Sequence, residues 1–148
     1  MKKGSSETLL LDVNVLLALA WPNHQFHGAT LRRLERSKEK WATCALTELG
    51  FIRLSSNPTV VGVAKSPAEA AALLRSLVGD PHHVYFENLP APSHPSVAGC
   101  FARILGCQQV TDAYLLRLAQ QHRAKLVTFD SRIAVMAENK DAVEVLGS

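Results

Sequence analysis

The sequence predicts a layered α/β domain in which helices pack against a central, mainly parallel sheet. Short apolar segments alternate along the chain with segments of helical periodicity, which is typical of parallel sheets. The first segment, Thr8–Val13, is an apolar run of the kind buried on both faces of such a sheet. We interpret residues 1–148 as one domain with a short lead-in over 1–7, because this length can bury a real core.

The first half of the chain alternates strand and helix patterns. After the first strand the chain turns helical through Leu16, Leu17 and Leu19, and Pro22 stops that helix. The next predicted elements are a helix over 24–37, a short strand over 40–44 (KWATC), and a helix over 45–56 (ALTELGFIRLSS) that Asn57-Pro58 ends.

The second half contains the helix with the clearest start signal. Ser66 is a plausible N-cap, Pro67 suits the first turn, and Glu69 completes a capping box for a helix over 66–80. The further predicted elements are a strand or extended segment over 83–89, a helix from about Pro95, a helix over 110–124, a strand over 125–129, and a short last strand over 142–146.

Composition and charge narrow the function classes. The net charge of +3 fits a polyanionic partner, and the three cysteines show no C-x-x-C spacing, so we expect buried thiols without a zinc site. No apolar run approaches the ~20 residues of a membrane span. Asp12 and Asn14 interrupt the one run that resembles a secretory segment, and we therefore expect a cytoplasmic protein.

Acidic residues fall at the ends of predicted elements. Asp12 ends the first strand, Asp130 ends the strand over 125–129, and Asp112 opens a helix. Strand carboxyl ends and helix N-termini share one edge of a parallel sheet, so these three aspartates can meet there. Glu48 lies about one turn into the helix that follows KWATC, within reach of the same edge.

Each acid also has an ordinary structural explanation. Asp112 could cap a helix, Asp130 could start a turn, and Glu48 could be a solvated surface residue. Asp12 is the hardest to explain in this way, because it lies between apolar neighbours and burial of an unpaired carboxylate is costly.

Clustered carboxylates require a cation or protonation. Two carboxylates ~4 Å apart repel by about 4 kcal/mol at an effective dielectric constant of 20. A set of oxygen ligands without cysteine or histidine suits Mg²⁺, with Mn²⁺ as a substitute, and Mg²⁺ readily shares its coordination shell with phosphate. This pattern points to phosphodiester chemistry.

Four segments in order, LLLDVNVLLAL, TELGFIRLSSNP, TDAYLLRLA and LVTFDSR, resemble the VapC-type toxins of the PIN-domain ribonucleases. The resemblance covers nearly the whole chain from Leu9 onward. It implies a PIN-like (Rossmann-like) three-layer fold, with helices on both sides of a central, mainly parallel sheet, and a Mg²⁺-dependent endoribonuclease. Carried over by position, Asp12 and Asp112 match the main metal-binding aspartates, Glu48 and Asp130 the third and fourth acids, and Asn14 and Thr111 supporting polar positions. Residues 61–99 carry little of the family signature.

The resemblance also implies partners: an RNA substrate, a homodimer, and a VapB-type antitoxin through which operator DNA is bound. We expect Asp12, Glu48 and Asp112 to hold the metal, with Asp130 assisting, while metal-activated water attacks phosphorus. Arg53 could position an RNA phosphate, as could Arg117 and Arg132.

Three other functions are compatible with an acidic α/β domain. A housekeeping PIN-domain nuclease without an antitoxin differs by the absence of an upstream partner gene. A receiver domain needs two adjacent acids after the first strand, and a haloacid-type phosphatase needs D-x-D there. Asp12 has no acidic neighbour and Asn14 occupies the third position, so the sequence disfavours both of these.

Overall fold

A parallel sheet forms the centre of the computed structural model, which describes residues 7–102, 104 and 106–147. Within these residues the sheet has five strands in the order β3-β2-β1-β4-β5, all parallel, which confirms the predicted sheet. Their carboxyl ends therefore share one edge. The strands are β1 (Thr8–Leu11), β2 (Trp41–Cys44), β3 (His83–Phe86), β4 (Ala124–Thr128) and β5 (Val143–Val145).

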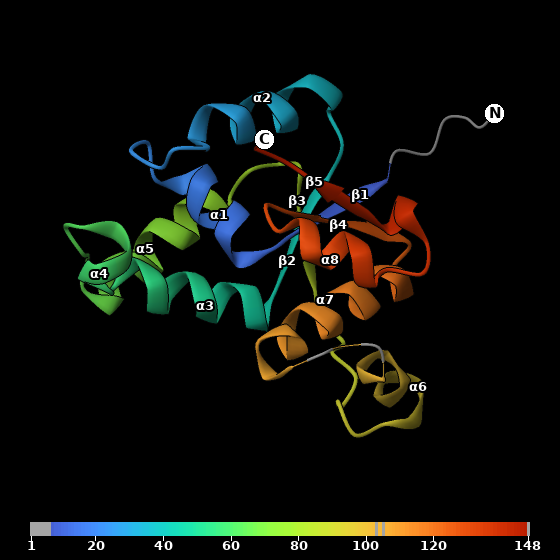
Figure 1. The fold of residues 1–148 in the computed structure, drawn as a ribbon. Helices are drawn as coiled ribbons and strands as arrows, with labels where there is room; N and C mark the ends of the chain where they lie inside the picture. The colour runs from blue at the N-terminus through green and yellow to red at the C-terminus, as the bar shows by residue number, and fades with distance from the viewer. Residues whose placement is uncertain (1–6, 103, 105, 148) are drawn as a thin grey trace.

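Helices cover both faces of the sheet (Figure 1), as the three-layer prediction requires. One side carries α1 (Val13–Ala20), α2 (His27–Ser37), α3 (Ala45–Ser55), α4 (Pro58–Val61) and α5 (Pro67–Leu77). The other side carries α6 (Pro95–Ala98), α7 (Val110–Gln121) and α8 (Ser131–Met136), together with short 3₁₀ turns at Gly99–Phe101, Cys107–Gln109 and Lys140–Ala142.

The central strand β1 contributes to two apolar cores because side chains alternate between the faces of a strand. Leu9 and Leu11 pack with α1, α3 and α5, whereas Leu10 packs with α7 and β4, and all three are fully buried. Each such leucine contributes about 1.5–3 kcal/mol by leaving water. Packing on both faces thus holds β1 in place and fixes the position of Asp12, the residue that follows it.

Several predicted boundaries were wrong by one to three residues, and two helices were not predicted. The first strand ends at Leu11 rather than Val13, because the Asp12 side chain caps α1. Asn57 and Asp130, expected to end or turn the chain, cap α4 and α8. The capping box at Ser66 and Glu69 is confirmed.

Other expectations about the chain have mixed outcomes. Cys44 is buried as expected, but Cys100 is partly exposed and Cys107 is exposed. Of the lead-in over 1–7, residues 1–6 lie outside the described part of the chain, and the interpretation of 1–148 as one domain stays a prediction. No helix among the described residues combines the length and apolar character needed to cross a membrane.

An arginine fixes the last strand to the first layer of helices. The Arg33 guanidinium on α2 donates from Nη2 to Glu144 Oε1 of β5 at 2.9 Å, and from Nη1 to Glu39 Oε1 at 3.0 Å. The Arg33 side chain is only 10% exposed. This charge, beside the Glu144 carboxylate, holds the pKa of Glu144 below its ordinary value of 4.5.

We predict that Glu144→Gln lowers the free energy of unfolding by about 1–2 kcal/mol at neutral pH, because it breaks a partly buried charge pair. Because the pKa of Glu144 is lower in the folded than in the unfolded protein, the ionised carboxylate stabilises the fold above pH 4.5. This stabilisation is lost as the pH falls through the pKa of Glu144 in the folded protein. The difference from wild type should therefore shrink below pH 4.5 in urea titrations. Exposed Glu87→Gln is the control, and an equal loss there would contradict the prediction.

Candidate functional site

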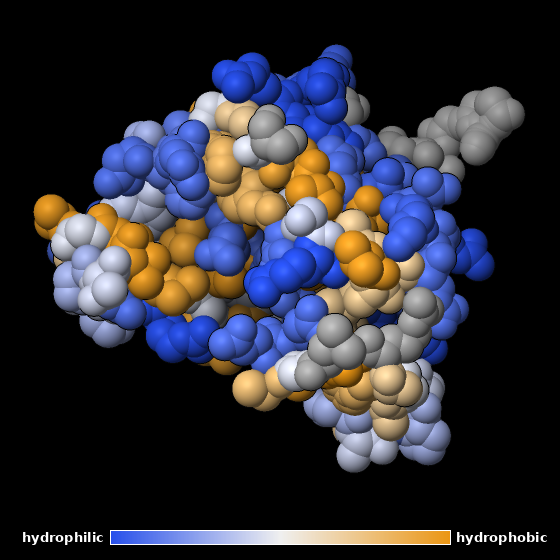
Figure 2. Space-filling model, viewed as in Figure 1, coloured by the Kyte–Doolittle hydropathy of each residue, from blue (hydrophilic) through white to orange (hydrophobic). Residues whose placement is uncertain are grey.

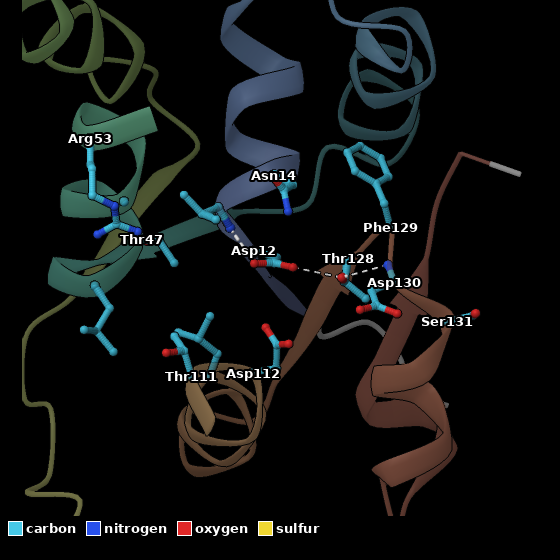
Figure 3. A pocket seen from close by; sticks show the side chains of 14 residues that line it. Asp12, Asn14, Thr47, Arg53, Thr111, Asp112, Thr128, Phe129, Asp130 and Ser131 are labelled. Carbon is cyan, nitrogen blue, oxygen red and sulfur yellow. Dashed lines mark hydrogen bonds between the residues drawn. The ribbon is translucent and has the colours of Figure 1, made fainter. Parts of the chain in front are cut away.

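An acidic pocket of about 500 Å³ opens at the edge of the sheet where the strands end. Its walls come from the N-terminal parts of α1 and α7, from one face of α3 along most of its length, and from the turn between β4 and α8 (Figure 3). The sequence-predicted site residues that line it are Asp12, Asn14, Arg53, Thr111, Asp112 and Asp130. The structure therefore brings these six residues together, whereas Glu48, Arg117 and Arg132 do not line the pocket.

Asp12 is the most constrained carboxylate of the pocket. Its Oδ1 accepts from the Val13 backbone N–H at 2.6 Å, and its Oδ2 accepts from the Thr128 hydroxyl at 2.9 Å. The residue is only 6% exposed, and this burial raises the pKa of Asp12 against the effect of both hydrogen bonds. A fixed, poorly solvated carboxylate of this kind binds a cation with little loss of conformational freedom.

Asp112 approaches Asp12 from the first turn of α7 (Figure 3). Burial raises the pKa of Asp112 to about 6, and the charges of Asp12 and Asp130 add to this increase. No described residue donates a hydrogen bond to its carboxylate, in contrast to Asp12. The two carboxylates therefore share a partly desolvated space in which each destabilises the charge of the other.

Asp130 has a different local role. Its Oδ1 accepts from the Arg132 backbone N–H at 2.9 Å and so caps α8, and its Oδ2 accepts from Arg132 Nη2 at 2.8 Å. This pairing holds the pKa of Asp130 below its ordinary value. Asp130 thus lines the pocket, but Arg132 already balances its charge.

Glu48 was expected to join the three aspartates, but in the structure its side chain lies against Thr43 instead. Its Oε2 accepts from the Thr43 hydroxyl at 2.6 Å, and that hydroxyl lies 2.8 Å from His83 Nε2. Glu48 is not among the pocket-lining residues, whereas Thr47, Gly50 and the preceding Leu46 are. Successive helix positions differ by 100°, so α3 turns Thr47 toward the pocket and Glu48 toward β3.

Two functional features were missed in the sequence. Thr128 ends β4 fully buried, and its hydroxyl donates to Asp12 while it accepts from the Asp130 N–H at 3.1 Å. Gly50 lets α3 approach α1, since a Cβ there would lie 2.8 Å from Val13 Cγ2. The signal for Thr128 was a polar residue two positions before Asp130, directly after the apolar pair Leu126-Val127.

The donor set fits a hard divalent cation held by few protein ligands. Among the described residues, no group of three or more His, Cys, Asp or Glu side chains is arranged to hold a metal ion. Mg²⁺ commonly takes only one or two carboxylates and fills its shell with water and phosphate oxygens. Asp12 and Asp112, two carboxylates whose pKa values are raised mainly by burial, supply that number of ligands.

The comparisons with known proteins agree with this architecture. The PIN domain family matches residues 9–139. The chain belongs to the PIN-domain family. It is 40% identical over 140 residues to Ribonuclease VapC39 of Mycobacterium tuberculosis, a match that covers 94% of this chain and 99% of that protein. It is 40% identical over 141 residues to Ribonuclease VapC38 of the same organism, covering 93% and 96%.

Solved structures share the fold of this PIN domain. The VapBC2 crystal structure from Rickettsia felis, bound to a promoter DNA fragment, aligns with a TM-score of 0.68 at 12% identity and covers 95% of this chain and 99% of that one. A toxin–antitoxin complex from Klebsiella pneumoniae aligns with a TM-score of 0.63 at 18% identity, covering 95% and 97%. The resemblance to VapC-type PIN domains inferred from the four segments is confirmed.

We predict that Thr128→Val in this PIN domain lowers the affinity of the pocket for Mg²⁺ by about 10- to 100-fold, because Asp12 loses the donor that orients it. The free energy of unfolding should fall by about 1–2 kcal/mol. Thr30→Val is the matched control, since the buried Thr30 hydroxyl donates to Phe26 O at 2.9 Å on α2. Thermal shifts with Mg²⁺ and RNA cleavage should change only in Thr128→Val; equal changes in both variants would contradict the prediction.

Proposed function

We propose that this PIN domain is a Mg²⁺-dependent endoribonuclease and the toxin of a VapBC-type pair. The observation that carries the proposal is the pair of desolvated carboxylates, Asp12 and Asp112, at the open edge of the sheet. The names of the relatives support an RNA substrate. The fold alone does not, because one fold serves many chemistries.

Asp12 and Asp112 would hold the metal, with Asn14, Thr111 and Asp130 around them. Mg²⁺, or Mn²⁺ in its place, supplies a Lewis acid that polarises phosphate and lowers the pKa of bound water. Thr128 and the Val13 N–H orient Asp12, whereas Asp112 stays accessible from the pocket. Glu48 would contribute only after its side chain leaves Thr43, so we assign the first two ligands to the aspartates.

Arg53 is the cation best placed to bind an RNA phosphate. It lines the pocket on the side opposite Asp130 (Figure 3), and no hydrogen bond or ion pair joins it to another described residue. Arg132 is paired with Asp130, and Arg117 donates to Ser96 O at 3.0 Å on the other layer. A guanidinium that faces the acids across the pocket, with no hydrogen-bond or ion-pair partner among the described residues, suits a polyanion that the acids alone would repel.

The toxin assignment adds three further proposals. The solved relatives include a toxin–antitoxin complex and VapBC2 bound to promoter DNA. By analogy we propose a VapB-type antitoxin, a homodimer, and operator DNA contacted through the antitoxin. We also propose that the protein acts in the cytoplasm, where it would meet RNA and promoter DNA.

The central test is RNA cleavage by Asp12→Asn and Asp112→Asn. Each variant should fold and lose at least about 100-fold of its activity, because the amide is a poor substitute for an anionic metal ligand. Mg²⁺ should raise the melting temperature of wild type and not of either variant. Asp141→Asn, at an exposed turn, is the control and should behave as wild type. Wild-type cleavage that persists in excess EDTA would refute the metal requirement.

A second test addresses Arg53. We predict that Arg53→Ala raises KM for RNA by about tenfold or more with a smaller effect on kcat, because a charge-assisted phosphate contact is lost. Arg53→Lys should recover part of the loss. Exposed Arg75→Ala on α5 is the control for loss of one positive charge. Equal KM values for Arg53→Ala and Arg75→Ala would remove Arg53 from the RNA site.

A further inference from the structure

A second hollow of about 370 Å³ lies directly beside the acidic pocket and differs from it in chemistry. This apolar groove runs between the N-terminal ends of α3 and α7 and the segment that precedes α6. Its lining includes Leu46, Leu89, Ala91, Phe101, Val110 and Tyr114. Leu46 and Thr111 line both hollows, so a molecule bound in the acidic pocket can continue into the groove without crossing open surface.

The groove offers apolar walls and few polar partners. The Tyr114 hydroxyl donates to Pro90 O at 2.6 Å, so this pair satisfies itself, and Tyr114 is only 5% exposed. Leu46 and Val110 at the rim are 40% and 43% exposed. Such a surface suits a ligand with apolar faces and polar edges that stay in water, and it does not suit a sugar or a phosphate.

The groove is also held in shape before any ligand arrives. The hydrogen bond from Tyr114 links α7 to the loop before α6, and Pro90 and Pro92 limit the freedom of that loop. A preformed wall of this kind needs little ordering on binding. The exposed valines Val60 and Val63, which gather over α4 (Figure 2), have no comparable hollow among the described pockets and adjoin neither site.

We propose that the apolar groove is a subsite for one unpaired nucleobase of the RNA, next to the phosphate that is cleaved. The proposal rests on the proposed ribonuclease function. Thr111 neighbours Asp112 at the start of α7 (Figure 3) and lines both hollows, so a nucleotide whose phosphate lies near Asp112 would direct its base toward the groove. An apolar wall contacts the face of a base and makes no hydrogen bonds to its edges, so it accepts any of the four bases. The base must, however, be unpaired to leave its helix and enter the groove. The subsite therefore selects single-stranded or looped RNA rather than a particular nucleotide.

The test fills the groove from its exposed side. Ala91→Trp should raise KM for short single-stranded oligoribonucleotides by about tenfold or more, the range of one lost stacking contact, with kcat nearly unchanged. Ala91→Ser, which leaves the groove open, should retain the wild-type KM. Ala72→Trp, on the exposed face of α5, controls for an added tryptophan. The Mg²⁺-induced thermal shift should be the same in all four proteins.

Substrates with a single abasic ribose identify the occupant. In wild type, removal of the base at one position beside the scissile bond should raise KM by a similar factor, and Ala91→Trp should add no further loss on that substrate. If the effects of the abasic ribose and Ala91→Trp multiply, or if Ala91→Trp leaves KM unchanged, the subsite is refuted. An unchanged KM with altered self-association or antitoxin binding would assign the groove to protein contacts instead. A wild type that cleaves no RNA would refute the proposed function as well.

Discussion

The hydrogen bond from the Thr128 hydroxyl to the Asp12 carboxylate joins the ends of the two central strands. Asp12 begins α1, Thr128 ends β4, and the same hydroxyl accepts from the Asp130 N–H at the start of the turn into α8. One buried polar contact therefore fixes three chain segments at the open edge of the sheet. The hydrogen bonds from Thr128 and Val13 offset part of the free-energy cost of burying the Asp12 carboxylate. They do not offset all of it, because the pKa of Asp12 stays raised.

Much of the fold could be predicted because local and long-range signals agree in this chain. The continuous apolar run of β1 indicated a strand buried on both faces, and the capping box at Ser66 and Glu69 indicated the start of α5. Three of the differences share one cause. Asp12, Asn57 and Asp130 were read as ends or turns, but each side chain accepts a backbone N–H and starts a helix. Capping depends on where the next backbone N–H groups lie, which sequence spacing leaves open.

The candidate site shows a similar division. Asp12, Asp112 and Asp130 could be brought together from the sequence because strand ends and helix starts share one edge of a parallel sheet. The direction of Glu48 could not be predicted, since it depends on the rotation of α3 about its axis. That rotation follows from the packing of Phe51 into the core. Thr128 lacked a sequence signal strong enough to separate it from the apolar strand around it, and its importance comes from pairing with a residue 116 positions away.

The glycine at position 50 has a consequence for how this chain can vary. Its missing methyl group sets how closely α3 approaches α1, because Val13 fills that space and a branched side chain at a helix start has little rotational freedom. The distance across the pocket from the acids to Arg53 thus depends on the lack of a Cβ at Gly50. A related chain that keeps every acid but has a larger residue at position 50 would hold the same acids at a different distance from Arg53. A comparison of the acidic residues alone would not distinguish such a chain from one with the pocket geometry described above.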